Sequence, residues 1–193
     1  MTRKPKILIL AGSIRTGAYS QQVADAFAGE LVNHDCEITR ITLADYELPI
    51  ILEMPKSDRD IPANAVNLAK QFDAHDALVI VTPEYNGSVP PLLKNAIDWV
   101  SNAQGESNKD LKPFREKICA IASSSPGMMG GISAIGHLRE ILVRLGMLVI
   151  SEQLAVGGAA RAFDDKGRLG DDRAASMLAI ACKSLVEKAS LLA

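Results

Sequence analysis

The residues best suited to chemistry begin in segment 12–20, where one cation stands among hydroxyl groups just before a predicted helix. Arg15 has the N–H geometry to bind two phosphate oxygens, and Ser13 and Ser20 add neutral donors. Backbone N–H groups at a helix N-terminus also favour an anion. The segment matches neither the P-loop nor the dinucleotide-binding glycine pattern, so it predicts a different kind of phosphate site. An ordinary capped turn between strand and helix is the alternative.

A second group of polar and aromatic residues lies at 82–88, directly after a wholly apolar run. Backbone N–H groups near Glu84 to Asn86 are suited to meet the edge of a flat heterocycle. Tyr85 is suited to pack against a ring, and Asn86 offers both a donor and an acceptor. Taken in isolation, the segment also fits a turn of Pro, Asn and Gly that leads into a helix cap.

A third segment, 123–131, is rich in serine and glycine. Small residues and glycines let the backbone approach a ligand that larger side chains would keep away. Ser124, Ser125 and Gly127 are the candidates here. A flexible surface loop is the alternative interpretation.

The elements that must position these segments are short apolar runs alternating with helical patterns. The runs predict five strands, at residues 7–10, 38–43, 77–81, 118–122 and 147–150. The third run is apolar at every position, which is typical of a parallel strand that is covered on both faces.

Apolar side chains at helical spacing predict helices after the first segment, after Pro91, around residues 135–145 and from about residue 173. Strands that alternate with helices predict an α/β protein, here a flavodoxin-like, doubly wound, five-stranded parallel sheet. The chain is expected to form a single domain over residues 1–193. Residues 52–61 and 101–112 are expected to be long loops.

In such a sheet, ligands bind outside the carboxyl ends of the strands, where the winding reverses. The three segments follow the first, third and fourth expected strands, so they should converge on one edge. The first offers a cradle for a monophosphate, and the other two offer walls for a planar group. Together they predict a site for a planar ligand that carries a single phosphate.

The overall composition argues against several other classes of function. Lys and Arg number 21 against 23 Asp and Glu, a net charge of -2, so a nucleic-acid partner is not expected. Cys36, Cys119 and Cys182 are widely spaced, and the histidines are isolated, so no disulfide framework and no metal site are predicted. The cysteines are interpreted as small buried apolar residues. No apolar run reaches the length of a membrane span, and a cytoplasmic protein without a membrane partner is expected.

At these segments the sequence resembles the NADPH-dependent FMN reductase family, which includes bacterial quinone and chromate reductases. The family pattern G-S-x-R is matched by residues 12–15, and S-S-x-G-x-x-G-G by residues 124–131. The most specific element, T-P-E-Y-N-x-S-x-P-x-x-L-K-N-A-I-D-W, is matched by residues 82–99, with Pro91 in place of the usual Gly. The chain departs from many members at Ala18, where Ser is usual, and at Ser20, where Asn is usual. The first change removes a hydroxyl contact to phosphate and the second shortens a donor.

The resemblance implies FMN as bound cofactor and NADPH or NADH as hydride donor, with a quinone or another small molecule as acceptor. Because the flavin carries the chemistry in such enzymes, no side chain is assigned a catalytic role, and Glu84 is interpreted as structural. A flavodoxin-type electron carrier without a nicotinamide site is the alternative, and Arg15 argues against it. A third possibility is an interaction domain that has lost its flavin. The residues expected to bind the cofactor are Ser13, Arg15, Ser20, Gln21, Pro83, Glu84, Tyr85, Asn86, Gly87, Ser124, Ser125 and Gly127.

The resemblance also implies a homodimer or homotetramer with the flavin near a subunit interface. Residues 48–52 are apolar although a surface loop is expected there, and an exposed apolar patch often marks a contact surface. The helix at residues 92–99 is expected to share that contact. Packing of this loop on its own core is the alternative.

Overall fold

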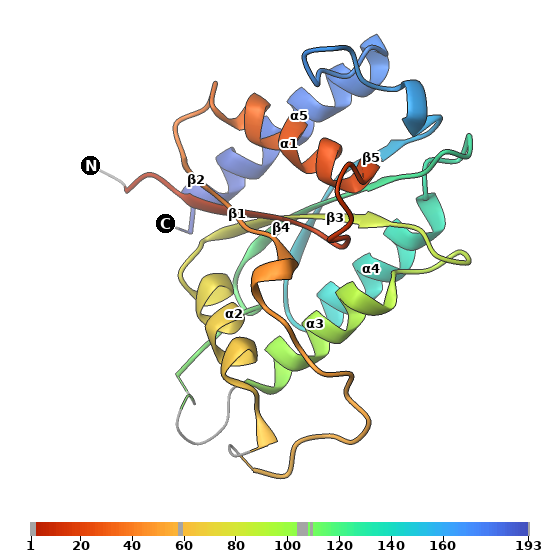
Figure 1. The fold of residues 1–193 in the computed structure, drawn as a ribbon. Helices are drawn as coiled ribbons and strands as arrows, with labels where there is room; N and C mark the ends of the chain where they lie inside the picture. The colour runs from red at the N-terminus through yellow and green to blue at the C-terminus, as the bar shows by residue number, and fades with distance from the viewer. Residues whose placement is uncertain (1–2, 58–59, 104–107, 109, 193) are drawn as a thin grey trace.

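The computed structural model describes residues 3–57, 60–103, 108 and 110–192. Its centre is a five-stranded parallel sheet with strand order β2-β1-β3-β4-β5 (Figure 1). The strands are β1 (Lys6–Ala11), β2 (Glu37–Arg40), β3 (Ala77–Pro83), β4 (Ile118–Ser124) and β5 (Leu148–Val156). The helices are α1 (Tyr19–Leu31), α2 (Ala63–Asp73), α3 (Pro91–Asn102), α4 (Ile132–Arg144) and α5 (Asp172–Ser190).

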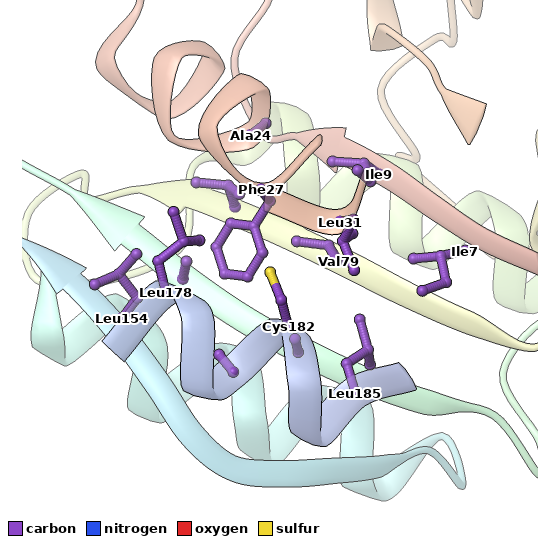
Figure 2. Close-up of a cluster of buried hydrophobic side chains, with 14 of the residues drawn as sticks. Ile7, Ile9, Ala24, Phe27, Leu31, Val79, Leu154, Leu178, Cys182 and Leu185 are labelled. Atoms are coloured by element: carbon purple, nitrogen blue, oxygen red, sulfur yellow. The ribbon is translucent and has the colours of Figure 1, made fainter. Parts of the chain in front are cut away.

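Helices cover both faces of the sheet, which confirms the predicted flavodoxin-like α/β class. On one face, α1 and α5 pack around fully buried Phe27 and Cys182 (Figure 2). On the other face lie α2, α3 and α4, with Phe72 and Leu138 in the core. Successive side chains of a strand point to opposite faces, so Ile7 enters the first core and Leu8 the second. This is why the central strands are apolar at every position over residues 7–11, 77–81 and 118–122.

Three of the five predicted strands lie inside observed ones, but the second and fifth differ in extent. The second was expected over residues 38–43, yet β2 ends at Arg40, and Leu43 instead opens a 3-10 helix, Leu43–Asp45. The side chain of Thr42 accepts a hydrogen bond from the N–H of Ala44 there, which ends the extended conformation. At the other edge, β5 runs on to Val156, because its second half pairs with the end of β4 after a register shift.

One helix, α2, was not expected from the sequence. It begins after Pro62 and buries Ala65, Leu68, Ala69 and Phe72 against the sheet. Half of its buried positions are alanines, whose weak apolar signal hides the helical spacing. The expected long loop at 52–61 precedes it and is described except for residues 58 and 59. The expected loop at 101–112 begins later, because α3 includes Ser101 and Asn102, and residues 104–107 and 109 lie outside the described part.

Ionisable groups gather at the amino edge of the sheet, where the strands begin. The Nζ of Lys117 donates to the carbonyl groups of Asp73 and His75 at 2.9 and 2.7 Å, and so caps the end of α2. Burial lowers the pKa of both Lys117 and His75. Arg3 pairs with Asp76 at 2.7 Å. These contacts join α2 to β3 and β4 at the edge where the chain enters the strands.

Cys119 and Cys182 are buried in the core, as expected, whereas Cys36 is only half-buried. Within the described residues, no group of three or more His, Cys, Asp or Glu side chains is placed to hold a metal ion. None of the helices formed by the described residues is long and apolar enough to cross a membrane.

Candidate functional site

The loops that follow β1, β3 and β4 leave the sheet at one edge (Figure 1). Ala11 pairs with Val81 in register, and the next N–H, that of Gly12, donates to the Val81 carbonyl at 2.8 Å. Thr82 pairs with Ser123 at the ends of β3 and β4. From β1 the chain leads to β2 on one side of that strand, and it then crosses over to β3 on the other side. The three loops therefore meet at the point where the winding reverses, which is where such sheets bind ligands.

The first loop holds Arg15 at the surface, above a buried serine. The hydroxyl of Ser13 accepts a hydrogen bond from the N–H of Arg15 at 3.3 Å, which bends the loop toward α1. Among the described residues, the guanidinium of Arg15 has no hydrogen bond or ion pair. Its N–H groups are therefore available to bind two oxygens of one anion in a bidentate manner.

Within the described residues, the N-cap residue of α1 makes no side-chain hydrogen bond to the helix, as is also the case for α2, α3 and α4. The cap of α1 is Ala18, which has no side-chain oxygen, and its first turn has no acidic residue. By contrast, α5 is capped by Asp171, whose carboxylate accepts from the N–H of Ala174 at 2.8 Å. Ser20 is 1% exposed, and its hydroxyl has no hydrogen-bond partner in the described structure. The first turn of α1 thus presents N–H groups and an unpaired hydroxyl that suit a phosphate.

Gln21 lies beside this loop, but its amide group is bound within the chain. The amide nitrogen donates to the Ser13 carbonyl, and the amide oxygen accepts from the guanidinium of Arg40. Arg40 also pairs with Asp25 of α1 at 3.2 Å. The side chain of Gln21 therefore holds the first loop against α1, and direct contact with a cofactor stays a prediction.

The second loop is a two-residue hairpin turn. Tyr85 and Ser88 exchange both of their backbone hydrogen bonds, at 2.9 and 3.0 Å. Between them, Asn86 and Gly87 have φ of 51° and 77°, the left-handed conformation that a tight type I′ turn requires and that Asn-Gly favours. Pro83, the last residue of β3, pairs with Ser124. The Tyr85 side chain is 56% exposed at the base of the turn.

Side chains at both ends of this hairpin bind α4. A carboxylate oxygen of Glu84 accepts the N–H of Ala134 in the first turn of α4, at 3.1 Å. The Ser88 hydroxyl is hydrogen-bonded to Nδ1 of His137, 2.9 Å away. The sequence singled out neither the Ser88 hydroxyl nor His137 for the site, since these residues are 49 positions apart and no spacing connects them.

The third loop is tied to the chain that follows β5. The Gly127 carbonyl accepts from the N–H groups of Gly130 and Gly158, both at 3.2 Å, and the Ser125 hydroxyl accepts from the Gly127 N–H at 3.2 Å. Ser124 is 3% exposed, and its hydroxyl has no partner among the described residues. The loop is therefore tied by hydrogen bonds within itself and to the chain after β5.

These features fit an FMN. A buried hydroxyl without a partner is costly, yet Ser20 and Ser124 each carry one beside the loops in question. Ser20 lies in the first turn of α1, next to the free cation Arg15, where a phosphate would bind. Ser124 lies at the carboxyl end of β4, between the two loops suited to a planar ring. These polar groups thus fit a ligand that has one anionic group and one planar group.

Comparison with known proteins gives the same result. The model of the family described as NADPH-dependent FMN reductase matches residues 5–161. A quinone reductase of Escherichia coli is 36% identical over 164 residues, which cover 82% of this chain and 80% of that protein. An NAD(P)H-dependent FMN reductase of Pseudomonas aeruginosa is 34% identical over 179 residues, covering 90% and 89%. A flavoenzyme NAD(P)H:(acceptor) oxidoreductase of Paracoccus denitrificans has the same fold, with a TM-score of 0.77 at 24% identity over 96% and 97% of the two chains. The chain belongs to the NADPH-dependent FMN reductase family.

Proposed function

We propose that this protein is an FMN-dependent oxidoreductase that takes hydride from NADPH or NADH and delivers it to a quinone or another small acceptor. The observation that carries this proposal is that three features meet at one edge of the sheet. They are the guanidinium of Arg15 and the N-terminus of α1, which have no side-chain partner in the described part of the chain, and the loops after β3 and β4. We further propose that residues 1–193 act as one FMN-binding unit and that the protein works in the cytoplasm. Its three free cysteines fit a reducing compartment.

Bound FMN would supply the hydride-transfer chemistry between nicotinamide and acceptor. The residues of the chain bind and orient the FMN. Arg15, Ser13 and Ser20 hold the phosphate, and Gln21 keeps their loop in place. The ring is bordered by two loops. These are the second loop, from Pro83 to Gly87, and the third loop, at Ser124, Ser125 and Gly127. No side chain of these loops is required to transfer a proton.

The direct test is to purify the protein, identify the released cofactor, and follow NADPH and NADH oxidation with benzoquinone as acceptor. We expect FMN, and quinone-dependent oxidation that disappears when FMN is removed and returns when it is added. A protein that holds FMN but does not oxidise either nicotinamide would be an electron carrier of the flavodoxin type. A protein that binds no flavin would contradict the proposal altogether.

The hairpin assignment predicts the effect of replacing Asn86. Glycine adopts φ of 51° without strain, so Asn86→Gly removes the amide group while the turn survives. We expect the affinities for FMN and for riboflavin to fall together, by about two- to tenfold, because the lost contacts are to the ring. Titration of the apo-protein with each flavin measures this. If only the affinity for FMN fell, Asn86 would be assigned to the phosphate and not to the ring.

We also propose that the protein forms a homodimer or homotetramer through the loop at residues 48–52, together with the neighbouring Met54. This loop is anchored on α3 at Pro49, whose carbonyl accepts from the side chains of Asn95 and Trp99 at 3.0 and 2.7 Å. Yet Ile50, Leu52 and Met54 are 64%, 90% and 64% exposed. Apolar side chains that are exposed to water on an anchored loop favour a contact with a second copy of the chain. The alternative, a loop folded over its own core, holds for part of the loop, because Leu48 packs against the core formed with α2, α3 and α4 and Ile51 is half-buried. Ile50 and Leu52 are left to form the proposed contact.

Light scattering on the FMN-loaded protein tests this proposal. We expect a mass of at least twice 20.6 kDa, and a shift toward 20.6 kDa for Leu52→Glu. Leu191→Glu is the matched control, since Leu191 is 83% exposed at the far end of α5. A monomeric mass for the unmodified protein at micromolar concentration would refute the oligomer.

A further inference from the structure

Helix α4 connects the second and third loops of the site through hydrogen bonds at its first two turns. The third loop runs directly into α4, whose N-cap is Gly131. The second loop is bound to the same helix twice, by Glu84 to the Ala134 N–H and by Ser88 to His137. Both contacts bring together residues about 50 positions apart in the chain.

These two contacts bracket the part of the second loop that we assign to the flavin ring. Glu84 precedes the hairpin and Ser88 closes it, so Asn86 and Gly87 lie on the free turn between two anchored ends. Ser88 already exchanges backbone hydrogen bonds with Tyr85, and its hydroxyl is not needed to form the turn. The hydrogen bond to His137 therefore orients the turn relative to α4.

We propose that His137 and Glu84 are positioning residues, which set the hairpin at residues 85–88 against the third loop so that both meet the flavin ring. The proposal rests on the ring-site assignment made above. His137 is exposed and lies outside both loops, so its loss should act on flavin binding through Ser88 and leave the core intact. Glu84 should act through the first turn of α4, where a carboxylate also meets favourable N–H groups.

The test is a double-mutant cycle of Ser88→Ala and His137→Leu, read by the riboflavin affinity of the apo-protein and by the visible absorption spectrum of bound flavin. We expect each single change to weaken riboflavin binding by about two- to tenfold and to shift the spectrum, and the double variant to be no worse than either single one. His137→Asn should restore affinity and spectrum, because its side-chain amide can replace Nδ1. Glu84→Gln, which keeps an acceptor, should bind better than Glu84→Leu.

Glu140→Leu is the control, because Glu140 is exposed on the next turn of α4 and touches neither loop. Unchanged riboflavin affinity and spectrum in the two single variants would overturn the positioning role, as would losses that simply add in the double variant. Asn86→Gly distinguishes this failure from failure of the proposed site. If that variant also binds riboflavin normally, the ring-site assignment is wrong and the positioning role falls with it.

Discussion

Replacing Arg15 by alanine is expected to weaken FMN binding by about tenfold or more, while riboflavin binding stays nearly unchanged. The guanidinium is exposed and has no partner among the described residues, so its removal costs the fold little. The lost contact is a charge-assisted one to phosphate, which riboflavin lacks. Gln21 and Ser13 keep the loop in place in the variant, since their contacts do not involve the Arg15 side chain.

The measurement is titration of the apo-protein with both flavins at fixed salt, because an exposed charge contact weakens as salt rises. Arg144→Ala is the matched control, since Arg144 is also exposed but lies at the opposite end of α4. It removes the same charge without touching the first loop. Equal FMN affinities for Arg15→Ala and Arg144→Ala would disprove the phosphate assignment.

Gly130→Ala should both destabilise the protein and weaken binding of either flavin. Gly130 has φ of 63°, and a Cβ there would lie 2.8 Å from the backbone of Ala155 and of Gly157. The strain of the left-handed conformation adds to the displacement of a neighbouring backbone, together about 2–5 kcal/mol of unfolding free energy. The third loop must then move away from the end of β5, and its ring-binding edge moves with it.

The variant Gly167→Ala separates the conformational strain from the displacement of a neighbouring backbone. Gly167 has φ of 74°, but a Cβ there would meet nothing within 4 Å. Only the conformational strain, about 1–2 kcal/mol, should appear in this variant, and flavin affinity should not change. Denaturant unfolding of the two apo-variants and flavin titration of each give the comparison. If both variants lose the same stability and bind flavin equally well, the third loop is not held as described.

The sequence alone determined the class of fold and which three loops meet at one edge of the sheet. Continuous apolar runs identify central strands, because these strands are covered on both faces. The residues that follow β1, β3 and β4 are forced to one edge by the parallel arrangement, so the convergence of the three loops follows from strand order. The edge strand β2 and the alanine-rich helix α2 were misjudged or missed, since their burial is partial or their side chains are small.

Only the tertiary structure decided what each polar side chain of the site does. Glu84 turns to the first turn of α4, Gln21 turns to Ser13 and Arg40, and Ser88 reaches His137. Arg15, Ser20 and Ser124 are left without partners among the described residues. Residue type and spacing do not distinguish these cases, because a hydrogen bond depends on distances between elements that are far apart in the chain. Packing of α4 against the sheet and pairing of β5 with β4 set those distances, and with them which groups remain free for a cofactor.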